Sequence, residues 1–476
     1  MKAIYTLILI TALATSSNAQ SIIGSWGGKI DIGTRKVLFI MHLSKDGDKY
    51  YATFDSPDQN SFDLKGGEAF LIADSVNAKI PSMNAGYLGK WNGKDEMSGL
   101  FTQGNFKTSL ALRRLNEAEV PKNPLAVARP QTPKKPYAYN SETVEYNNAD
   151  GTVHFGATLT TPLNSNNFPT VIIISGSGPQ DRDGTMMGHK PYWVLADYLT
   201  AHGIGVLRVD DRGTGLSTVG PNPLKLTSAD FANDVESSIQ FLLSRKEINP
   251  SKIGLIGHSE GGMIAPMVAA RNKNVAFITL LAGPGTPGDQ IWKYQMRRNF
   301  VKLNLTPTDS IKAANFVNSM NDAFKQSTDY ATIKKTMQDT FINFKKNTSN
   351  EEESRLLNSI GDKAYIGLID QFKNGLTWLN YFMNYDPSIN LSTIKCPVLA
   401  VNGESDIQIT SKENLAGIQK ALKKAKNKHY TIHSFPNLNH LFQTCKSPSE
   451  PYNTIDETFS PIALDYISNW INKTIR

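Results

Sequence analysis

The chain is organised around residues 252–266, which read Lys252-Ile253-Gly254-Leu255-Ile256-Gly257-His258-Ser259-Glu260-Gly261-Gly262-Met263-Ile264-Ala265-Pro266. The apolar run before the serine predicts a buried strand, and the run after it predicts a helix. The Gly-x-Ser-x-Gly pattern therefore falls on a sharp turn, where a side chain at Gly257 or Gly261 would collide with neighbouring backbone. Such a turn projects the hydroxyl of Ser259 from the sheet edge as a candidate nucleophile; the alternative is an ordinary glycine-rich turn.

Apolar strands alternate with amphipathic helices from residue 170 to residue 281, and the alternation resumes at residue 397. This pattern predicts an α/β fold with a mostly parallel sheet covered by helices on both faces. Between the two blocks, residues from about 286 to 390 read as largely helical, which predicts a cap over the sheet edge. A β-hairpin is expected before the sheet, at residues 141–161.

Two loops in the second half of the chain hold candidate partners for the serine. Ligands of a parallel sheet bind at the carboxyl ends of its strands. Asp406 follows the strand predicted at 397–401 and is the candidate acid, with Glu404 as the alternative. His440 follows the last predicted strand and is the candidate base, in the order serine, acid, histidine that this turn requires.

The loop Ser175-Gly176-Ser177-Gly178 follows the strand predicted at 170–175. Its small residues leave backbone N–H groups open, so we expect the amides of Ser177 and Glu260 to form an oxyanion hole. For Glu260 we expect the backbone N–H, rather than the carboxylate, to matter. A glycine-rich turn without a ligand is the alternative for the Ser177 loop.

With these residues placed, the chain resembles the α/β-hydrolase superfamily and, within it, bacterial serine carboxylesterases with a helical cap and an N-terminal β domain. The resemblance covers about residues 140–476 and rests on five motifs: Ser175-Gly176-Ser177-Gly178-Pro179 through Asp183, Asp210-Asp211-Arg212-Gly213-Thr214-Gly215-Leu216-Ser217, Gly257-His258-Ser259-Glu260-Gly261-Gly262, Gly403 to Asp406, and Asn439-His440-Leu441-Phe442. It implies Ser259 as nucleophile, His440 as base and Asp406 as acid. One departure is Ser175-Gly176, where the family usually has His-Gly.

Charged residues in the matched region are expected to be mainly structural. Asp210, Asp211 and Arg212 should brace the loops near the site through ion pairs and hydrogen bonds. Asp181 and Arg182 lie nearer the Ser177 loop, and contact with an acyl or alcohol group is the alternative for them.

The N-terminal third differs in composition from the rest. Residues 1–19 combine Lys2, an apolar stretch and small residues before Ala19, which predicts a signal peptide and a periplasmic or extracellular protein. Residues 20–115 read as eight short strands, the fourth at 70–74, which predicts a small antiparallel barrel or sandwich. Residues 116–141 are proline-rich and read as a linker to the hydrolase domain at 142–476.

The composition of the chain argues against several classes of partner and cofactor. The net charge of +7 comes from scattered residues, and the lysine run from Lys420 to Lys428 is expected to be a solvated helix face rather than a nucleic-acid site. No stretch after the N-terminus reaches the ~18 apolar residues of a membrane span. No metal-binding motif is present, so no cofactor is expected. Cys396 opens a predicted strand of about six residues, and Cys445 follows His440 near the far end of that strand, so the two are expected to be too far apart for a disulfide.

These features predict a serine carboxylesterase that acts on small esters with short acyl chains, with water as the acyl acceptor. A serine aminopeptidase or amidase of the same fold is the alternative; the run Glu351-Glu352-Glu353 could bind its free amino terminus, although a solvated helix start is the other interpretation. A non-catalytic binding protein would be expected to lack the nucleophile or the base, and both are present here.

Overall fold

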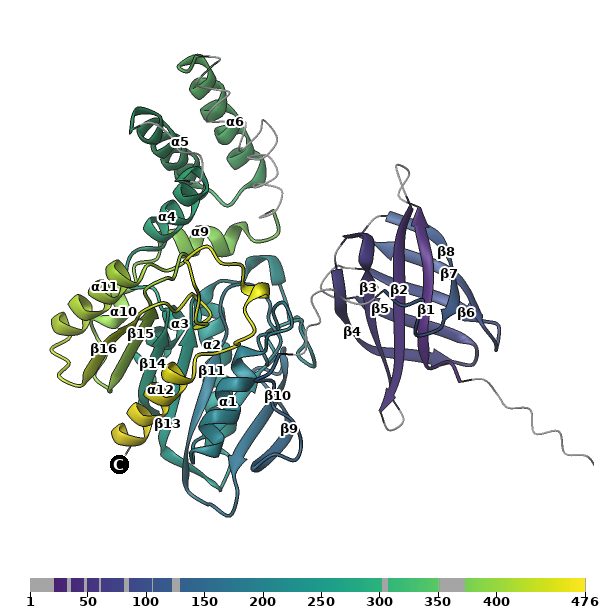
Figure 1. Ribbon diagram of the computed structural model, residues 1–476, viewed down its shortest axis with the longest axis horizontal. Helices are drawn as coiled ribbons and strands as arrows, with labels where there is room; N and C mark the ends of the chain where they lie inside the picture. The colour runs from purple at the N-terminus through teal and green to yellow at the C-terminus, as the bar shows by residue number, and fades with distance from the viewer. Residues whose placement is uncertain are drawn as a thin grey trace, which may run out of the picture. The chain divides into compact units, whose positions relative to one another are not determined.

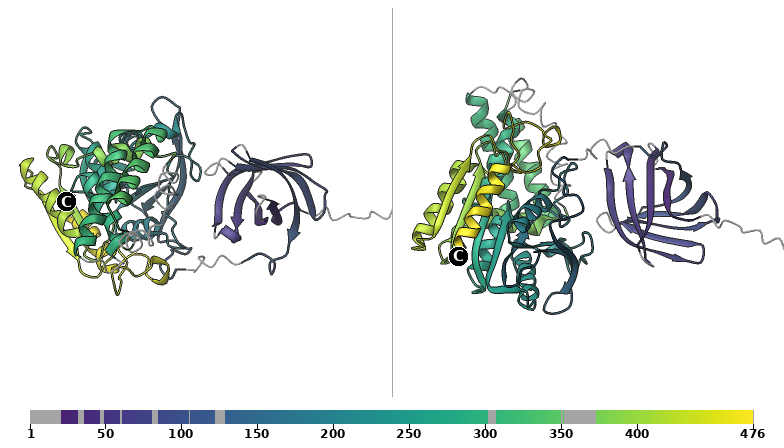
Figure 2. Two further views of the ribbon diagram at one scale, coloured as in Figure 1. Left: turned by 90° about the horizontal axis from the view of Figure 1, so that it is seen from above. Right: turned by 60° about the horizontal axis from the view of Figure 1, so that its bottom comes forward.

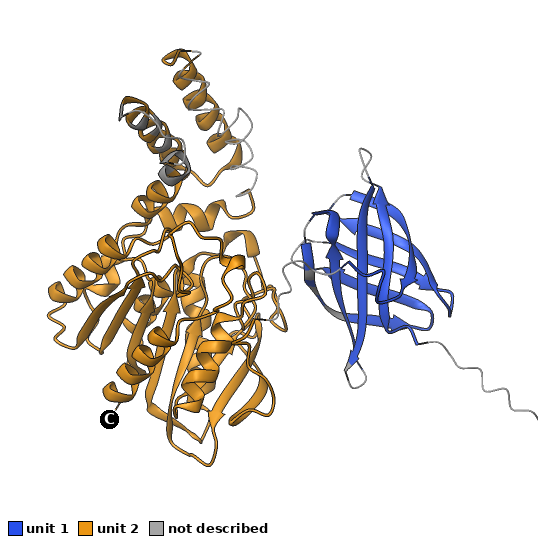
Figure 3. Ribbon diagram, in the orientation of Figure 1, with its two compact units in different colours: residues 1–123 blue, residues 124–476 orange. Residues whose placement is uncertain are grey.

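The computed structural model describes residues 21–475 apart from 32–35, 47–48, 60, 81–84, 105, 122–128, 302–306, 350 and 352–372. It divides into two compact units, residues 1–123 and 124–476, which Figure 3 colours blue and orange. The predicted signal peptide, residues 1–19, lies outside the described residues. Among the described residues, no helix combines the length and the apolar character that a bilayer span needs.

The first unit is a closed barrel of eight strands, which confirms the predicted all-β domain. Each strand pairs antiparallel with the next, and β8 pairs back with β1. The strands are β1 (Gly24–Asp31), β2 (Lys36–Asp46), β3 (Lys49–Ser56), β4 (Ser61–Ile72), β5 (Ser75–Ile80), β6 (Ala85–Trp91), β7 (Glu96–Gln103) and β8 (Phe106–Leu115), with a short 3₁₀ turn η1 (Pro57–Gln59) after β3.

Large apolar side chains alternate along these strands and fill the barrel, as the period of two requires. Trp26, Phe54, Tyr87 and Met97 are among those that are fully buried. The prediction for β4 was wrong at both ends: it begins nine residues before residue 70, and residue 74 lies in the following turn.

The second unit contains an eight-stranded sheet in the order β16-β15-β14-β13-β11-β12-β10-β9. The expected hairpin forms the antiparallel edge, and the remaining strands run parallel to one another. The strands are β9 (Tyr139–Asn147), β10 (His154–Pro162), β11 (Phe168–Ile174), β12 (Gly205–Val209), β13 (Ile248–His258), β14 (Val275–Leu281), β15 (Val398–Gly403) and β16 (Tyr430–Phe435).

Helices cover both faces of this sheet, which confirms the predicted α/β architecture (Figures 1 and 2). On one face, α1 (Pro191–Ala201) and α12 (Pro461–Thr474) bury a core with Ile256 and Phe277. On the other, the core contains residues of α2 (Ser228–Leu243), α3 (Gly261–Ala269) and α11 (Ser411–Lys424). The lysines of the α11 run, Lys420, Lys423, Lys424, Lys426 and Lys428, are exposed, so the predicted solvated face is confirmed.

The strand order changes direction near the middle of the sheet, at β11. After β11 the chain adds β12 on one side, and β13 then pairs on the other side of β11. Ligands of open α/β sheets bind at such a switch point, outside the carboxyl ends of the strands. The loop after β11 carries Ser177, and the turn after β13 carries Ser259.

A helical insertion lies between β14 and β15, in the region predicted as a cap. Its described helices α4 (Gly288–Val301), α5 (Pro307–Gln326), α6 (Tyr330–Lys346) and α9 (Leu376–Asn384) lie beyond the carboxyl end of the sheet, at the top of Figure 1. The short helix α10 (Ser388–Leu391) precedes β15 and packs beside α11. Two further 3₁₀ turns, η3 (Pro223–Lys225) and η4 (Tyr452–Thr454), lie in loops of the unit.

Part of the proline-rich segment is bound to the second unit. Arg129 is 3% exposed, and its guanidinium group donates hydrogen bonds to the carbonyls of Met187 and Ile455. The amide of Gln131 donates to the carbonyl of Phe459. Residues 129–131 therefore pack with the sheet unit rather than forming a free connection. Both cysteines are free thiols.

Candidate active site

Ser259 occupies a strained turn between β13 and α3. Its φ is +54°, in the left-handed region that non-glycine residues rarely adopt. A Cβ atom at Gly257 would lie 2.0 Å from the carbonyl oxygen of Gly261, and one at Gly261 would lie 2.3 Å from that of Ile174. The two glycines therefore permit the backbone contacts that hold the serine at the sheet edge. Its amide donates to the Leu281 carbonyl at the end of β14, at 2.9 Å.

The acid and the base are joined by a buried hydrogen bond. His440 Nδ1 lies 2.7 Å from Asp406 Oδ2, and their side chains are 4% and 0% exposed. The other carboxylate oxygen accepts hydrogen bonds from the backbone amides of Gln408 and Ile409, at 2.7 and 3.0 Å. These two amides and His440 hold the carboxylate in place, and the hydrogen bond at His440 Nδ1 leaves Nε2 as the nitrogen that can act as a base.

Glu404, the alternative acid, points elsewhere. Its carboxylate is exposed and accepts a hydrogen bond from the hydroxyl of Ser434 on β16, at 2.8 Å. The structure therefore brings Asp406, and not Glu404, to the histidine.

Close backbone packing fixes the acid and base loops against each other. A Cβ atom at Gly403 would lie 2.1 Å from the carbonyl oxygen of Leu438, so the two loops can approach this closely because residue 403 is glycine. Within the second loop, the Asn439 side chain accepts from the amides of Leu441 and Gln443, both at 3.0 Å. His440 thus sits in a loop that is braced on both sides.

His258 connects the serine turn to the base. It precedes Ser259, its Nε2 donates to the His440 carbonyl at 3.0 Å, and the two imidazole rings are 4.9 Å apart. Its Nδ1 lies 3.1 Å from the hydroxyl of Tyr192. Burial, with the neighbouring His440 as a second cause, lowers the pKa of His258 to about 3, so it remains neutral and acts as a structural link.

The Ser177 loop lies against the serine. A Cβ atom at Gly176 would be 3.3 Å from that of Ser259, and the Gly176 amide donates to the hydroxyl of Tyr192 at 3.2 Å. The amides of Ser177 and Glu260, in contrast, have no acceptor within the described part of the chain. Both remain free to donate to a ligand at the switch point.

The charged motif after β12 braces this loop, as predicted. Asp211 accepts hydrogen bonds from the hydroxyl of Ser175, at 2.7 and 2.8 Å, and from the amide of Gln180. Burial is the largest cause that raises the pKa of Asp211, to about 7, against the effect of these hydrogen bonds. Asp210 is paired with Arg182 at 2.6 Å, which commits that arginine to an internal ion pair.

The carboxylate of Glu260 has contacts that sequence reasoning missed. The side chain is buried, and its Oε1 accepts from Ser228 Oγ at 2.5 Å and from Trp378 Nε1 at 2.7 Å. The expectation that only its backbone matters took no account of these bonds, because partners 32 and 118 residues away leave no local signal. A charged residue between the nucleophile and the apolar start of α3 was a hint in the sequence.

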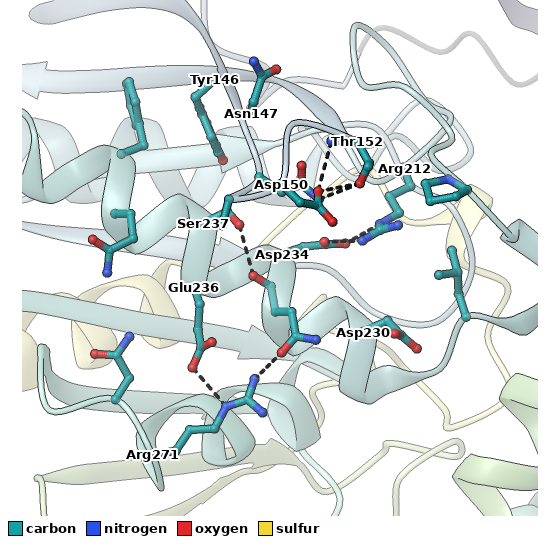
Figure 4. Close-up of a pocket in the computed structure, with 18 of the residues that line it drawn as sticks. Tyr146, Asn147, Asp150, Thr152, Arg212, Asp230, Asp234, Glu236, Ser237 and Arg271 are labelled. Atoms are coloured by element: carbon teal, nitrogen blue, oxygen red, sulfur yellow. Dashed lines mark hydrogen bonds and ion pairs between the residues drawn. The ribbon is translucent and has the colours of Figure 1, made fainter.

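One depression in the surface of the second unit lies away from these residues. It has a volume of about 1020 Å³ on the outer side of α2, between the turn at 147–152, the segment 221–226 and residues 271–274 (Figure 4). The ion pair Arg212–Asp234, at 2.6 Å, forms part of its wall. Ser259, Asp406 and His440 do not line it. Within the described ranges, no group of three or more metal-ligating side chains is present.

Two known proteins are similar in sequence to part of this chain. The esterase EstD of Thermotoga maritima is 32% identical over 139 residues, covering 29% of this chain and 32% of EstD. The uncharacterized protein YfhR of Escherichia coli is 30% identical over 129 residues, covering 27% of this chain and 41% of YfhR. The match therefore spans about a third of EstD and two fifths of YfhR.

The solved Pyrococcus furiosus esterase Pf2001 superposes with a TM-score of 0.41 at 14% identity, covering 71% of this chain and 92% of that chain. A family model described as alpha/beta hydrolase fold matches residues 169–443, which is more than half of the sequence and includes Ser259, Asp406 and His440. The chain belongs to the α/β-hydrolase fold family.

Proposed function

We propose that the protein is a serine carboxylesterase in which Ser259 is the nucleophile, His440 the general base and Asp406 the acid. One observation carries the proposal: the buried 2.7 Å hydrogen bond between His440 and Asp406, in a loop linked through His258 to the strained turn of Ser259. A neutral imidazole oriented in this way is the group that activates a serine hydroxyl.

The reaction proceeds by two acyl transfers. Ser259 Oγ attacks the ester carbonyl carbon while its proton passes to His440 Nε2, and Asp406 stabilises the imidazolium. The amides of Ser177 and Glu260 donate to the oxyanion. The C–O bond to the alcohol then breaks, and the alcohol leaves with the proton from His440. A water molecule attacks the acyl-enzyme, gives its proton to the same nitrogen, and the carboxylic acid is released as Ser259 regains its hydrogen.

The substrate class is supported by the stretch shared with EstD, an esterase by name. We propose a small ester with a short acyl chain, because α9 of the cap places Trp378 directly on the residue that follows the nucleophile. No cofactor is invoked: the steps above need water and the three side chains.

The direct test is hydrolysis of p-nitrophenyl acetate by wild type and by Ser259→Ala. The substitution should lower kcat by roughly 10⁶-fold, to the background of the remaining site. Ser237→Ala, on the solvent side of α2, is the matched control and should retain wild-type turnover. Equal turnover by Ser259→Ala and wild type would exclude the proposed nucleophile.

The same assay separates an esterase from an amidase of the same fold. Aminoacyl p-nitroanilides and p-nitrophenyl esters of matched acyl length should be compared. We expect a larger kcat/KM for the esters, and the reverse order would favour an aminopeptidase. In the acidic run proposed for amine binding, Glu352 and Glu353 lie outside the described residues.

We further propose that residues 1–19 direct export and are removed. The charged start, apolar stretch and Ala19 support this. N-terminal sequencing of the protein from periplasm or medium should begin at Gln20. A protein retained in the cytoplasm with an intact Met1 would contradict the proposal.

A further inference from the structure

Glu260 is a buried acid next to the nucleophile that the two acyl transfers leave unused. It is 3% exposed, and a carboxylate in such a place costs free energy unless hydrogen bonds replace its hydration. Burial is the main cause that raises its pKa, while hydrogen bonds from the side chains of Ser228, Trp378 and Ser177 oppose the rise. The side chain is therefore held by specific donors rather than by apolar packing.

The two closest donors come from different parts of the fold. Ser228 is the first residue of α2, which packs on the sheet, and Trp378 belongs to α9 of the cap. One carboxylate oxygen accepts both bonds, at 2.5 and 2.7 Å. A single atom of the residue after the nucleophile thus joins the body of the sheet unit to its cap.

Helix α9 is in turn fixed to the start of the cap. Trp378 stacks on Phe382, with ring centroids 5.6 Å apart. A Cβ atom at Gly288, the first residue of α4, would lie 1.8 Å from the Phe382 carbonyl oxygen. Trp378 therefore belongs to a packed pair of helices, α9 and α4, so its hydrogen bond to Glu260 connects that pair to the nucleophile turn.

We propose that the Glu260 carboxylate is a positioning group, which ties cap helix α9 to the nucleophile turn and thereby fixes the direction of the Glu260 backbone N–H. The inference rests on the proposed function, in which that N–H stabilises the oxyanion. The side chain and the N–H belong to one residue, so bonds that lock the carboxylate also restrict rotation of the peptide between Ser259 and Glu260. Oxyanion stabilisation depends steeply on donor direction.

The test is a double-mutant cycle with Glu260→Gln and Trp378→Phe on p-nitrophenyl acetate. Glu260→Gln keeps the shape but weakens the acceptor, and Trp378→Phe removes the indole N–H while keeping an aromatic ring. Each should lower kcat by roughly tenfold, less than the ~100- to 1,000-fold for loss of an oxyanion donor, with KM changed less than about twofold. The double variant should be no slower than the slower single variant, because both changes break the same connection.

Trp470→Phe is the matched control. Its indole N–H donates to the hydroxyl of Thr431, near the start of β16, at 3.0 Å. This substitution removes the same kind of hydrogen bond from another part of the unit and should leave kcat within about twofold of wild type. An equal loss of kcat in Trp470→Phe would show general destabilisation and would overturn the inference.

The outcomes separate this inference from the proposed function. If Ser259→Ala is as active as wild type, the proposed function fails. If Ser259→Ala is inactive but Glu260→Gln and Trp378→Phe keep wild-type kcat, the function stands and the positioning role is overturned. Losses that multiply in the double variant would also overturn it, since they indicate independent effects. Should Glu260→Gln not fold, a wild-type kcat in Trp378→Phe would still refute the connection.

Discussion

Two groupings of serine, histidine and aspartate in the described part of the chain share a histidine–aspartate hydrogen bond but differ in backbone conformation and in burial. In the barrel triplet, Ser25 Oγ lies 2.8 Å from His42 Nδ1, and His42 Nε2 lies 2.9 Å from Asp55 Oδ2. The second grouping is Ser259, His440 and Asp406, called the elbow triplet because Ser259 lies on the sharp turn between β13 and α3. Asp406 is hydrogen-bonded to His440 Nδ1, and His440 is connected through His258 to Ser259.

The surroundings of the two serines are unlike. Ser25 lies on the regular strand β1, directly opposite His42 on β2, whereas Ser259 has a φ of +54°. The histidine side chain is 26% exposed in the barrel triplet and 4% exposed in the elbow triplet. We therefore attribute the proposed reactivity of Ser259 to its strained turn, the buried histidine and the free amides, rather than to the three residue types themselves.

Substitution of the aspartate should give the largest difference in kcat between the two triplets. Asp406→Asn should lower kcat for p-nitrophenyl acetate by roughly 10⁴-fold, because the histidine loses the partner that selects its tautomer. Asp55→Asn should leave kcat at the wild-type value. A comparable loss in both variants would show that the barrel takes part in the reaction, and no loss in Asp406→Asn would remove Asp406 from the mechanism.

Burial around the elbow triplet predicts a pH dependence of stability. The pKa of Asp211 is about 7 in the folded protein against 3.8 for an ordinary aspartate. Between these values the folded chain holds a proton that the unfolded chain has lost, so the free energy of unfolding falls as pH rises, by up to about 1.4 kcal/mol per pH unit.

Urea unfolding of wild type and Asp211→Asn at pH values from 4 to 8 measures this effect. The free energy of unfolding of wild type, relative to the variant, should decline from pH 4 to 7 and level off above. A difference that does not vary with pH would contradict the assigned shift.

Removal of a tyrosine hydroxyl near each triplet should give a smaller difference in kcat/KM. Tyr192→Phe removes the acceptor of the Gly176 amide and the partner of His258, and should lower kcat/KM roughly tenfold by loosening the oxyanion loop. Tyr87→Phe removes a hydroxyl that donates to the Leu110 carbonyl inside the barrel, and should leave kcat/KM unchanged. Equal effects would mean that tyrosine substitutions act through overall stability.

The smallest effect is expected at the barrel serine. Ser25→Ala deletes one partly buried hydrogen bond and should lower the free energy of unfolding by about 1 kcal/mol or less, with esterase activity unchanged. Thermal unfolding and a rate assay check both parts. A fall in activity would give the barrel triplet a role that its geometry does not suggest.

Features fixed by local chemistry could be predicted from the sequence. The Gly-x-Ser-x-Gly turn, the alternating strands and the cap were read from short patterns, because glycine clashes and hydrophobic periods act over a few residues. Asp406 and Glu404 could not be separated in this way. Closure of the acid loop depends on Asn402, whose side chain donates to the carbonyl of Ile409 at 2.8 Å, and no local pattern reveals which carboxylate then faces the histidine.

Features that depend on distant packing were missed. The start of β4 contains charged residues and the pair Gly66-Gly67, which argue against a strand. In the barrel, a Cβ atom at Gly66 would lie 2.4 Å from the Phe54 ring, so glycine makes room for a neighbouring aromatic side chain. The barrel triplet joins residues of separate strands, and the contacts of Glu260 join residues of separate helices, so only the folded chain brings them together.

A fluorophosphonate probe followed by peptide mass spectrometry compares the two serines in one experiment. The probe phosphonylates a serine that is activated by a base and faces oxyanion donors. The account predicts one adduct, on Ser259, and its loss in His440→Gln but not in His42→Gln. An adduct on Ser25, or no adduct on Ser259 in the wild-type protein, would contradict it.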